Sequence, residues 1–171
     1  MTSMPTRSAA TKSVEAMVAA DALMFCGVGD AALVAQEAYQ RWARLGQKCY
    51  CAIDPDLQLI LASQLKAGDV IVTISHSGRS KSVLSVVREA EHVGALVVAI
   101  TNFPVSPLAK RASLVLQTAV FTTYAGDEVM SKRVAELCLI EGLYASFLMR
   151  KGEACIKNLR ASNEVVKINK Q

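Results

Sequence analysis

Three serine hydroxyls lie close together in one short stretch of the sequence, at Ser75, Ser77 and Ser80, with Gly78 among them. The stretch follows an apolar run and precedes a helical pattern. One serine is enough to cap the free backbone N–H groups at the start of a helix, so two of the three exceed what a cap requires. Hydroxyl and backbone N–H groups that converge at a helix N-terminus bind anions such as phosphate. The stretch therefore predicts a phosphate-binding loop, with a helix that begins near Ser80.

His76 lies in the same stretch and has a side chain that titrates near neutral pH. It could act on a proton, but no acidic residue of the sequence can be assigned as its partner. We therefore favour a histidine that shapes the pocket or donates a hydrogen bond to the ligand, and we predict no catalytic residue. Arg79 could add a positive charge to the site or simply be solvated.

A second candidate loop, "GVGDAAL", follows the first apolar run and contains Gly27, Gly29 and Asp30. The two glycines permit a tight turn and a close approach of the backbone to a ligand. The N–H groups at the start of the following helix could then face an anion or a sugar hydroxyl. A turn that simply needs glycine explains the same residues, and both interpretations stay open.

Two further loops carry polar side chains after apolar runs. Asp54, in "IDPD", could accept hydrogen bonds from sugar hydroxyls or simply open the next turn ahead of Pro55. Thr101 and Asn102 follow the run "ALVVAI", where they could touch the ligand or cap the short helix predicted near Ser106. These alternatives also stay open.

The elements that must position these loops alternate along the chain. Short apolar, β-branched runs are separated by segments with helical spacing, which is typical of an α/β fold with a parallel sheet and crossover helices. We predict a three-layer α/β/α sandwich with a five-stranded parallel sheet. The predicted strands cover residues 22–26, 48–53, 70–74, 95–100 and 114–116. Ligands of such sheets bind beyond the carboxyl ends of the strands, which is where the polar loops fall.

The helical segments have their own signals. A helix is predicted over residues 9–19, and Gly46 and Gly94 are predicted to end two connecting helices. A long helix is predicted from about Met130 to Leu148, with an unusually broad apolar face. Such a helix is either deeply buried or shared with a partner subunit, and we favour the second.

The length of the chain is that of one domain, and its positive charge is concentrated at the C-terminal end. The chain has 171 residues, 52% of them apolar, and a net charge of +4. Residues 150–171 hold six Lys and Arg against two Asp and Glu, so the excess lies there. No aromatic residue accompanies these charges, which favours a solvated basic tail or helix extension over residues 151–171 rather than a DNA-binding arm.

The cysteines and the apolar runs indicate the compartment. Five cysteines are present, none in a C-x-x-C pair, and most lie in apolar segments where reduced cysteine behaves as a small hydrophobe. No apolar run approaches the ~18 residues that span a bilayer, and no signal segment opens the chain. We therefore expect a soluble, cytoplasmic protein with no membrane contact, no metal and no cofactor.

The sequence resembles the SIS domain, the sugar-isomerase-type module, and more narrowly the C-terminal effector domain of RpiR-type transcriptional regulators. The resemblance covers about residues 10–150 and rests on the glycine turn at 27–29, the S-x-S-G-x-S loop at 75–80, and "SPLAKRA" at 106–112. It implies a five-stranded parallel sheet with flavodoxin-like winding, and a homodimer or higher homo-oligomer. It also implies a phosphosugar ligand, with the three serines holding the phosphate and Gly29 closing over the sugar.

The same resemblance bears on domain organisation. RpiR-type regulators usually carry a helix-turn-helix domain ahead of the sensor, which contacts DNA. Only about 20 residues precede the first predicted strand here, so DNA contact would need a domain that this chain lacks. We divide the chain into an N-terminal remnant or disordered segment (1–8), a phosphosugar-binding SIS domain (9–150) and the basic tail.

Three positions depart from the family pattern. Ala31 stands where members often carry serine, Ser80 replaces the usual threonine, and Ser82 occupies a position where many members have glutamate. A hydroxyl and a carboxylate expected near the ligand are therefore missing, which indicates a ligand different from the familiar ones.

These features favour a phosphosugar-sensing domain of a transcription regulator, without enzyme activity. The first alternative is a sugar-phosphate aldose–ketose isomerase, for which Glu128, Glu136 and His76 are candidate bases. The second is a dinucleotide site, since the loop "GVGDAAL" (residues 27–33, here the glycine loop) and Asp54 have a spacing that resembles the Rossmann pattern. The serine stretch argues against it, because a Rossmann site needs no second hydroxyl cluster.

Overall fold

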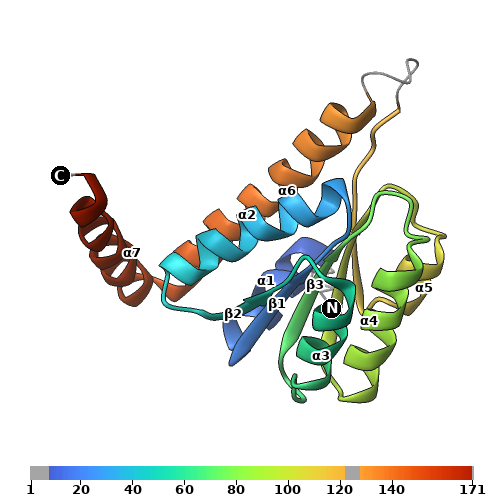
Figure 1. The fold of residues 1–171 in the computed structure, drawn as a ribbon, viewed down its shortest axis with the longest axis horizontal. Coiled ribbons are helices and arrows are strands. Elements are labelled where there is room, and N and C mark those ends of the chain that lie inside the picture. Colours follow the sequence, from blue (N-terminus) through green and yellow to red (C-terminus); the bar gives the residue numbers. More distant parts are fainter. Residues whose placement is uncertain (1–7, 122–127, 171) are drawn as a thin grey trace, which may run out of the picture.

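Five parallel strands form the centre of the molecule, and the structure, a computed structural model, describes residues 8–121 and 128–170 (Figure 1). The predicted N-terminal remnant lies outside the described residues except for Ser8, which caps the first helix. The strands are β1 (Ala22–Cys26), β2 (Lys48–Cys51), β3 (Val70–Ile74), β4 (Leu96–Thr101) and β5 (Leu114–Gln117). The helices are α1 (Ala9–Ala19), α2 (Asp30–Arg44), α3 (Pro55–Ser63), α4 (Lys81–His92), α5 (Pro107–Arg111), α6 (Glu128–Lys151), α7 (Glu153–Val165) and the 3₁₀ turn η1 (Val166–Lys170).

The strand order across the sheet is β2-β1-β3-β4-β5, with every neighbouring pair parallel. This is the flavodoxin-like winding that the resemblance implied. The chain moves outward from β1 to one edge and then returns to place β3 on the other side of β1. The loops that follow β1 and β3 therefore leave the sheet toward opposite faces and flank the crevice where ligands of this topology bind.

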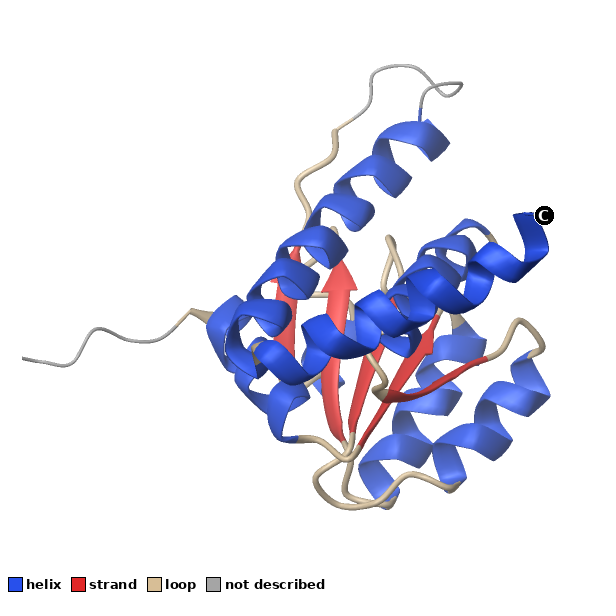
Figure 2. Ribbon diagram, turned by 90° about the vertical axis from the view of Figure 1, so that its left-hand side faces the viewer, coloured by secondary structure: helices blue, strands red, loops and turns tan. Residues whose placement is uncertain are grey.

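Helices cover both faces of the sheet, so the predicted three-layer sandwich is confirmed (Figure 2). One apolar cluster joins the sheet to α1, α2 and α6, and a second joins it to α3 and α4. Trp42 of α2 is fully buried in the first cluster, with its ring 5.3 Å from that of Phe25 and 5.8 Å from that of Phe147. These contacts pack α2 and α6 side by side over the sheet.

Three predicted strands differ from the observed ones. β5 extends one residue further, to Gln117, and the bounds of β2 and β4 differ for local reasons. β2 ends at Cys51 rather than at residue 53, since the Gln58 amide donates to the carbonyl of Ala52 at 2.8 Å. β4 begins at Leu96 because the N–H of Ala95 donates to the carbonyl of Ala90 at 2.9 Å and closes the end of α4. Gly94 supplies the positive φ, 82°, that this C-terminal motif requires.

The chain beyond the sheet is helical. α6 covers the predicted long helix and is exposed along part of its apolar surface, at Met130, Val134 and Met149. The basic tail forms α7, whose Asn158 donates from Nδ2 to the carbonyl of Leu45 at 2.9 Å and so satisfies the end of α2. Across residues 8–121 and 128–170, no helix has both the length and the apolar character to cross a membrane.

Candidate functional site

The loop of residues 75–80, here the serine loop, connects β3 to α4 and presents three hydroxyls at the N-terminus of α4. Each serine oxygen accepts a backbone N–H: Ser75 from Gly78 at 3.2 Å, Ser77 from Arg79 at 3.3 Å, and Ser80 from Val83 at 3.5 Å. A hydroxyl has one hydrogen to donate besides its lone pairs. Among the described residues no acceptor takes those hydrogens, so all three remain available to a ligand at the positive end of the helix dipole.

Gly78 is required for the shape of the serine loop. Its φ is 62°, and an added Cβ would lie 2.1 Å from the Oγ of Ser106, the residue that caps α5. Its carbonyl accepts the N–H of Leu108 at 3.0 Å. The loop therefore lies directly against the start of α5, and no side chain fits between them.

Thr101 fastens the same loop from β4. Its hydroxyl donates to the carbonyl of His76 at 3.1 Å and accepts the N–H of Phe103 at 3.3 Å. Asn102 instead bonds Thr118 and Val120 beyond β5, at 3.1 and 2.7 Å. Thr101 and Asn102 therefore neither cap α5 nor line the pocket, the two roles that the sequence left open. Instead, their side chains hold neighbouring loops together.

The serine loop forms one wall of a pocket of about 260 Å³. The glycine loop after β1 and the first turns of α6 complete it. The lining residues are Val28, Asp30, Ala31, Ile74, Ser75, His76, Ser77, Ser80, Lys132, Arg133 and Glu136. The structure thus brings together five of the predicted site residues: Asp30, His76 and the three serines.

The remaining predicted site residues lie outside the pocket lining. Gly27 and Gly78 shape the two loops: a Cβ on Gly27 would lie 2.6 Å from the carbonyl oxygen of Ala31. Gly29 is exposed, with φ 59°, and precedes α2. Asp54 caps α3 by accepting the N–H of Leu57 at 2.8 Å, which is the turn-opening alternative. The dinucleotide alternative would need the Asp54 carboxylate to bind a ribose hydroxyl, whereas here it is engaged in the cap of α3.

His76 lies in the serine loop with its ring edge-on to that of Phe103, the two centroids 5.7 Å apart at an interplanar angle of 88°. This contact orients the imidazole on the pocket wall. Whether His76 shapes the pocket or donates a hydrogen bond to the ligand stays a prediction.

The first turns of α6 supply positive charge that the sequence analysis did not assign to the site. Lys132 and Arg133 both line the pocket, and Arg133 donates from Nη2 to Asp30 at 2.9 Å. The Nε of Arg133 is buried and has no hydrogen-bond partner within the described part of the chain. An anion in the pocket could satisfy this donor, which adds to those of the serine loop.

Glu136 lies one helical turn further along α6 and is only 4% exposed. Burial raises its pKa to about 7. Lys132 and Arg133 oppose this shift through their positive charges, whereas Asp30 reinforces it. The pocket therefore contains a carboxyl that titrates near neutrality. From the sequence, Glu136 was only a candidate base for the isomerase alternative.

Gln58 also escaped the sequence analysis. Its side chain is fully buried and donates from Nε2 to the carbonyls of Gly27 and Ala52, at 2.9 and 2.8 Å. It thus ties the glycine loop to the end of β2. The one available signal was a polar residue in the apolar segment "DLQLILA".

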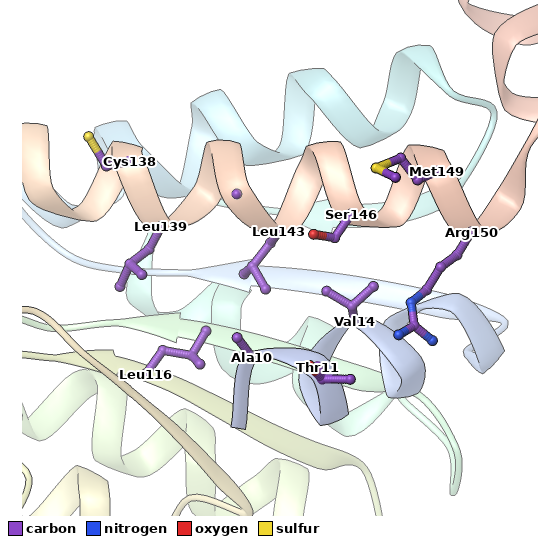
Figure 3. A pocket seen from close by; sticks show the side chains of 11 residues that line it. Ala10, Thr11, Val14, Leu116, Cys138, Leu139, Leu143, Ser146, Met149 and Arg150 are labelled. Atoms are coloured by element: carbon purple, nitrogen blue, oxygen red, sulfur yellow. The ribbon is translucent and has the colours of Figure 1, made fainter. Parts of the chain in front are cut away.

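A second cavity, of about 320 Å³, lies between α1 and α6 (Figure 3). Figure 3 shows Val14 of α1 below Leu143 and Ser146 of α6, with Arg150 at one end. Arg150 donates to Glu15 at 3.3 Å. The walls are otherwise largely apolar, and none of the predicted site residues contributes to them.

The chain belongs to the SIS domain family, whose model matches residues 9–146. Two curated relatives are HTH-type transcriptional regulators. TTE0211 of Caldanaerobacter subterraneus is 31% identical over 94% of this chain and 57% of its own length. HexR of Escherichia coli K12 is 30% identical over 94% of this chain and 55% of its own length. The chain therefore spans little more than half the length of these relatives.

Solved structures agree with this assignment. The NanR protein of Vibrio vulnificus, solved as a complex with ManNAc-6P, is 26% identical with a TM-score of 0.84, over 92% of this chain and 60% of that one. The sugar isomerase domain of an RpiR transcription factor from Sphaerobacter thermophilus has a TM-score of 0.80 over 91% of this chain and 86% of that one. Its identity is 23%, so it supports the fold alone. The resemblance drawn from the serine and glycine loops is thereby confirmed.

Proposed function

We propose that this chain is the phosphosugar-sensing domain of a transcription regulator and has no enzyme activity. The observation that carries the proposal is the convergence of three serine hydroxyls, the N-terminus of α4 and two basic side chains of α6 on one pocket. That donor set matches a phosphate group. The regulator relatives, and the ManNAc-6P complex of NanR, support a phosphosugar as the effector.

In this proposal the phosphate lies on the serine loop, where Ser75, Ser77 and Ser80 donate their free hydroxyl hydrogens. Lys132 and Arg133 balance its charge from the other wall. Each hydrogen bond to a charged group contributes about 1.5–3 kcal/mol, so two serines account for a large share of the affinity.

The sugar then extends toward the glycine loop, where Asp30 and the backbone around Gly27 and Gly29 lie nearest to it. Gly78, Thr101 and His76 keep the serine loop in its binding shape. Asp54 takes part only if its cap opens, because its carboxylate already accepts the N–H of Leu57.

Isothermal titration calorimetry against a phosphosugar panel tests the sensor proposal. The panel contains ManNAc-6P, glucose 6-phosphate, fructose 6-phosphate, ribose 5-phosphate and arabinose 5-phosphate. We expect one of them to bind more tightly than millimolar, and the double variant Ser75→Ala, Ser77→Ala to lose about 100-fold in affinity. Ser85→Ala is the matched control, because that hydroxyl lies on α4 outside the pocket and bonds the carbonyl of Lys81. An unchanged affinity of the double variant would contradict the proposal.

The rest of the regulator is proposed by similarity alone. The relatives are HTH-type proteins about twice as long as the region matched, so we assign DNA recognition to a helix-turn-helix domain outside this sequence. The five cysteines are all free thiols, which supports a reducing, cytoplasmic location.

We further propose a homodimer or higher homo-oligomer built on α6. Met130, Val134 and Met149 of this helix are 62%, 53% and 85% exposed, which is unusual for large apolar side chains of a helix that packs on a core. Sedimentation analysis measures the oligomeric state directly.

The alternative, a sugar-phosphate isomerase, has one observation in its favour. The carboxyl of Glu136 shares the pocket with His76 and has a pKa of about 7, which suits a general base. The side chain of Glu128, another candidate base, lies outside the described residues. Exchange of solvent protons into a bound phosphosugar, followed by NMR, would identify isomerase chemistry.

A further inference from the structure

Glu136 brings a negative charge into the pocket that we propose for a phosphate dianion. Its side chain is 4% exposed, and no hydrogen bond or ion pair engages its carboxyl within the described part of the chain. A buried carboxylate without such partners is costly, and a second anion in the same cavity increases that cost. The pocket would therefore bind the ligand best with this carboxyl neutral.

The charged and titratable groups around Glu136 come from three elements. Asp30 from α2 is negative and pairs with Arg133, while Lys132 and Arg133 from α6 are positive. His76 faces the same cavity from the serine loop. A phosphate dianion would attract the positive charges toward the serine loop and leave the carboxyl of Glu136 facing the sugar.

We propose that Glu136 binds the sugar portion of the ligand as a neutral carboxylic acid, so that ligand binding takes up one proton from solvent. The protonated acid donates its O–H to a sugar oxygen and accepts a sugar hydroxyl at its carbonyl oxygen. No other bond changes. This inference rests on the proposed phosphosugar site and assigns to Glu136 the hydrogen bonds that recognise the sugar.

The sign of the pH dependence follows from the proton balance. In the free protein the Glu136 carboxyl is half protonated near pH 7. The negative charge of the bound phosphate raises the pKa of this carboxyl further, so the carboxyl keeps its proton more tightly in the complex. Affinity therefore falls as the pH rises above 7, by about tenfold or more between pH 6.5 and 8.5. Below about pH 6 the phosphate ester itself gains a proton, so the test is kept above that pH.

Calorimetry in two buffers of different ionisation enthalpy measures proton uptake at pH 7.5, using the panel member that binds the wild-type protein most tightly. We expect uptake of between half a proton and one proton. Glu136→Gln is the matched variant, because glutamine reproduces the shape and hydrogen bonding of the neutral acid. It should keep affinity within about threefold at pH 6.5, take up no proton and lose the pH dependence.

Inorganic phosphate is the probe that lacks a sugar. Because Glu136 is assigned to the sugar, Glu136→Ala should weaken phosphosugar binding about tenfold or more at pH 6.5, where most of the wild-type carboxyl is neutral, and leave phosphate binding at that pH within about twofold. An equal loss for both probes would overturn the assignment. So would a pH dependence that persists in Glu136→Gln and disappears in His76→Gln, since the histidine would then be the titrating group.

The free protein provides a measurement that needs no ligand. Between the ordinary pKa of a glutamate and about 7, the folded protein holds a proton that the unfolded chain has lost, so the stability due to this group falls as the pH rises through that window. Glu136→Gln should therefore melt higher than wild type at pH 8 and similarly at pH 5. Equal melting at both pH values would refute the inference. If instead no panel member binds wild type but the melting difference is found, the phosphosugar proposal fails while the buried neutral carboxyl is established.

Discussion

Two of the cavities that border α6 are alike in size and unlike in chemistry. The pocket at the serine loop, about 260 Å³, combines three hydroxyls, a helix N-terminus and the charges of Lys132 and Arg133. The second cavity, between α1 and α6, is a groove of about 320 Å³ that is lined mainly by apolar side chains. Its one arginine, Arg150, is already paired with Glu15. The larger cavity thus offers few polar groups to a phosphosugar.

The difference shows that the density of unsatisfied donors, not volume, distinguishes the candidate site. In the pocket the hydroxyl hydrogens of the serine loop and the Nε of Arg133 have no acceptor among the described residues. A polar ligand gains most where such donors are already oriented, because no further ordering is needed on binding. Three substitutions, each compared with wild type or with a control variant, test this contrast.

Gly78→Ala should have the largest effect. The new Cβ would meet the Oγ of Ser106 at 2.1 Å, and φ is 62°, so we expect a loss of stability of about 3 kcal/mol and at least about a 100-fold loss of phosphosugar affinity. Gly152→Ala is the control, with a φ of 66° and no atom within 4 Å of the new Cβ. It should cost about 1 kcal/mol and leave affinity unchanged. Denaturant unfolding and calorimetry measure both, and wild-type binding by Gly78→Ala would exclude the serine loop as the site.

The two arginines of α6 form the next comparison. Arg133→Gln removes a charge from the pocket, so phosphosugar affinity should fall about tenfold and become less sensitive to salt. Arg150→Gln breaks only the exposed pair with Glu15 and should change affinity less than about twofold and stability by less than about 1 kcal/mol. Titrations at two salt concentrations measure both variants. Equal losses for the two would mean that net charge, rather than the pocket, attracts the ligand.

Filling the groove should have the smallest effect. Ser146→Phe places a large ring between α1 and α6, in a space that Figure 3 shows bordered by Val14 and Leu143. We expect phosphosugar affinity to stay within about twofold and stability to change by about 1 kcal/mol in either direction. Calorimetry checks the first expectation and thermal melting the second. A tenfold loss of affinity would instead show that the groove and the pocket are coupled.

Much of the fold could be predicted because its signals are local. The helix at residues 9–19 and the strands β1 and β3 match their predicted bounds, since burial on both faces makes such strands continuously apolar. The ends of β2 and β4 could not be placed exactly. Gln58 and the C-terminal motif of α4 take up the backbone groups concerned, through contacts between residues that periodicity does not report.

The parallel α/β sheet, the serine loop and its place at the start of α4 follow from the sequence alone, because apolar periodicity and helix caps depend on neighbouring residues. What faces that loop depends on the tertiary structure. α6 begins about fifty residues further along the chain, and its Lys132, Arg133 and Glu136 join the site because the winding of the sheet brings this helix over the crevice between β1 and β3. The pKa of Glu136 near 7 likewise arises from burial, which no spacing of residues along the sequence encodes.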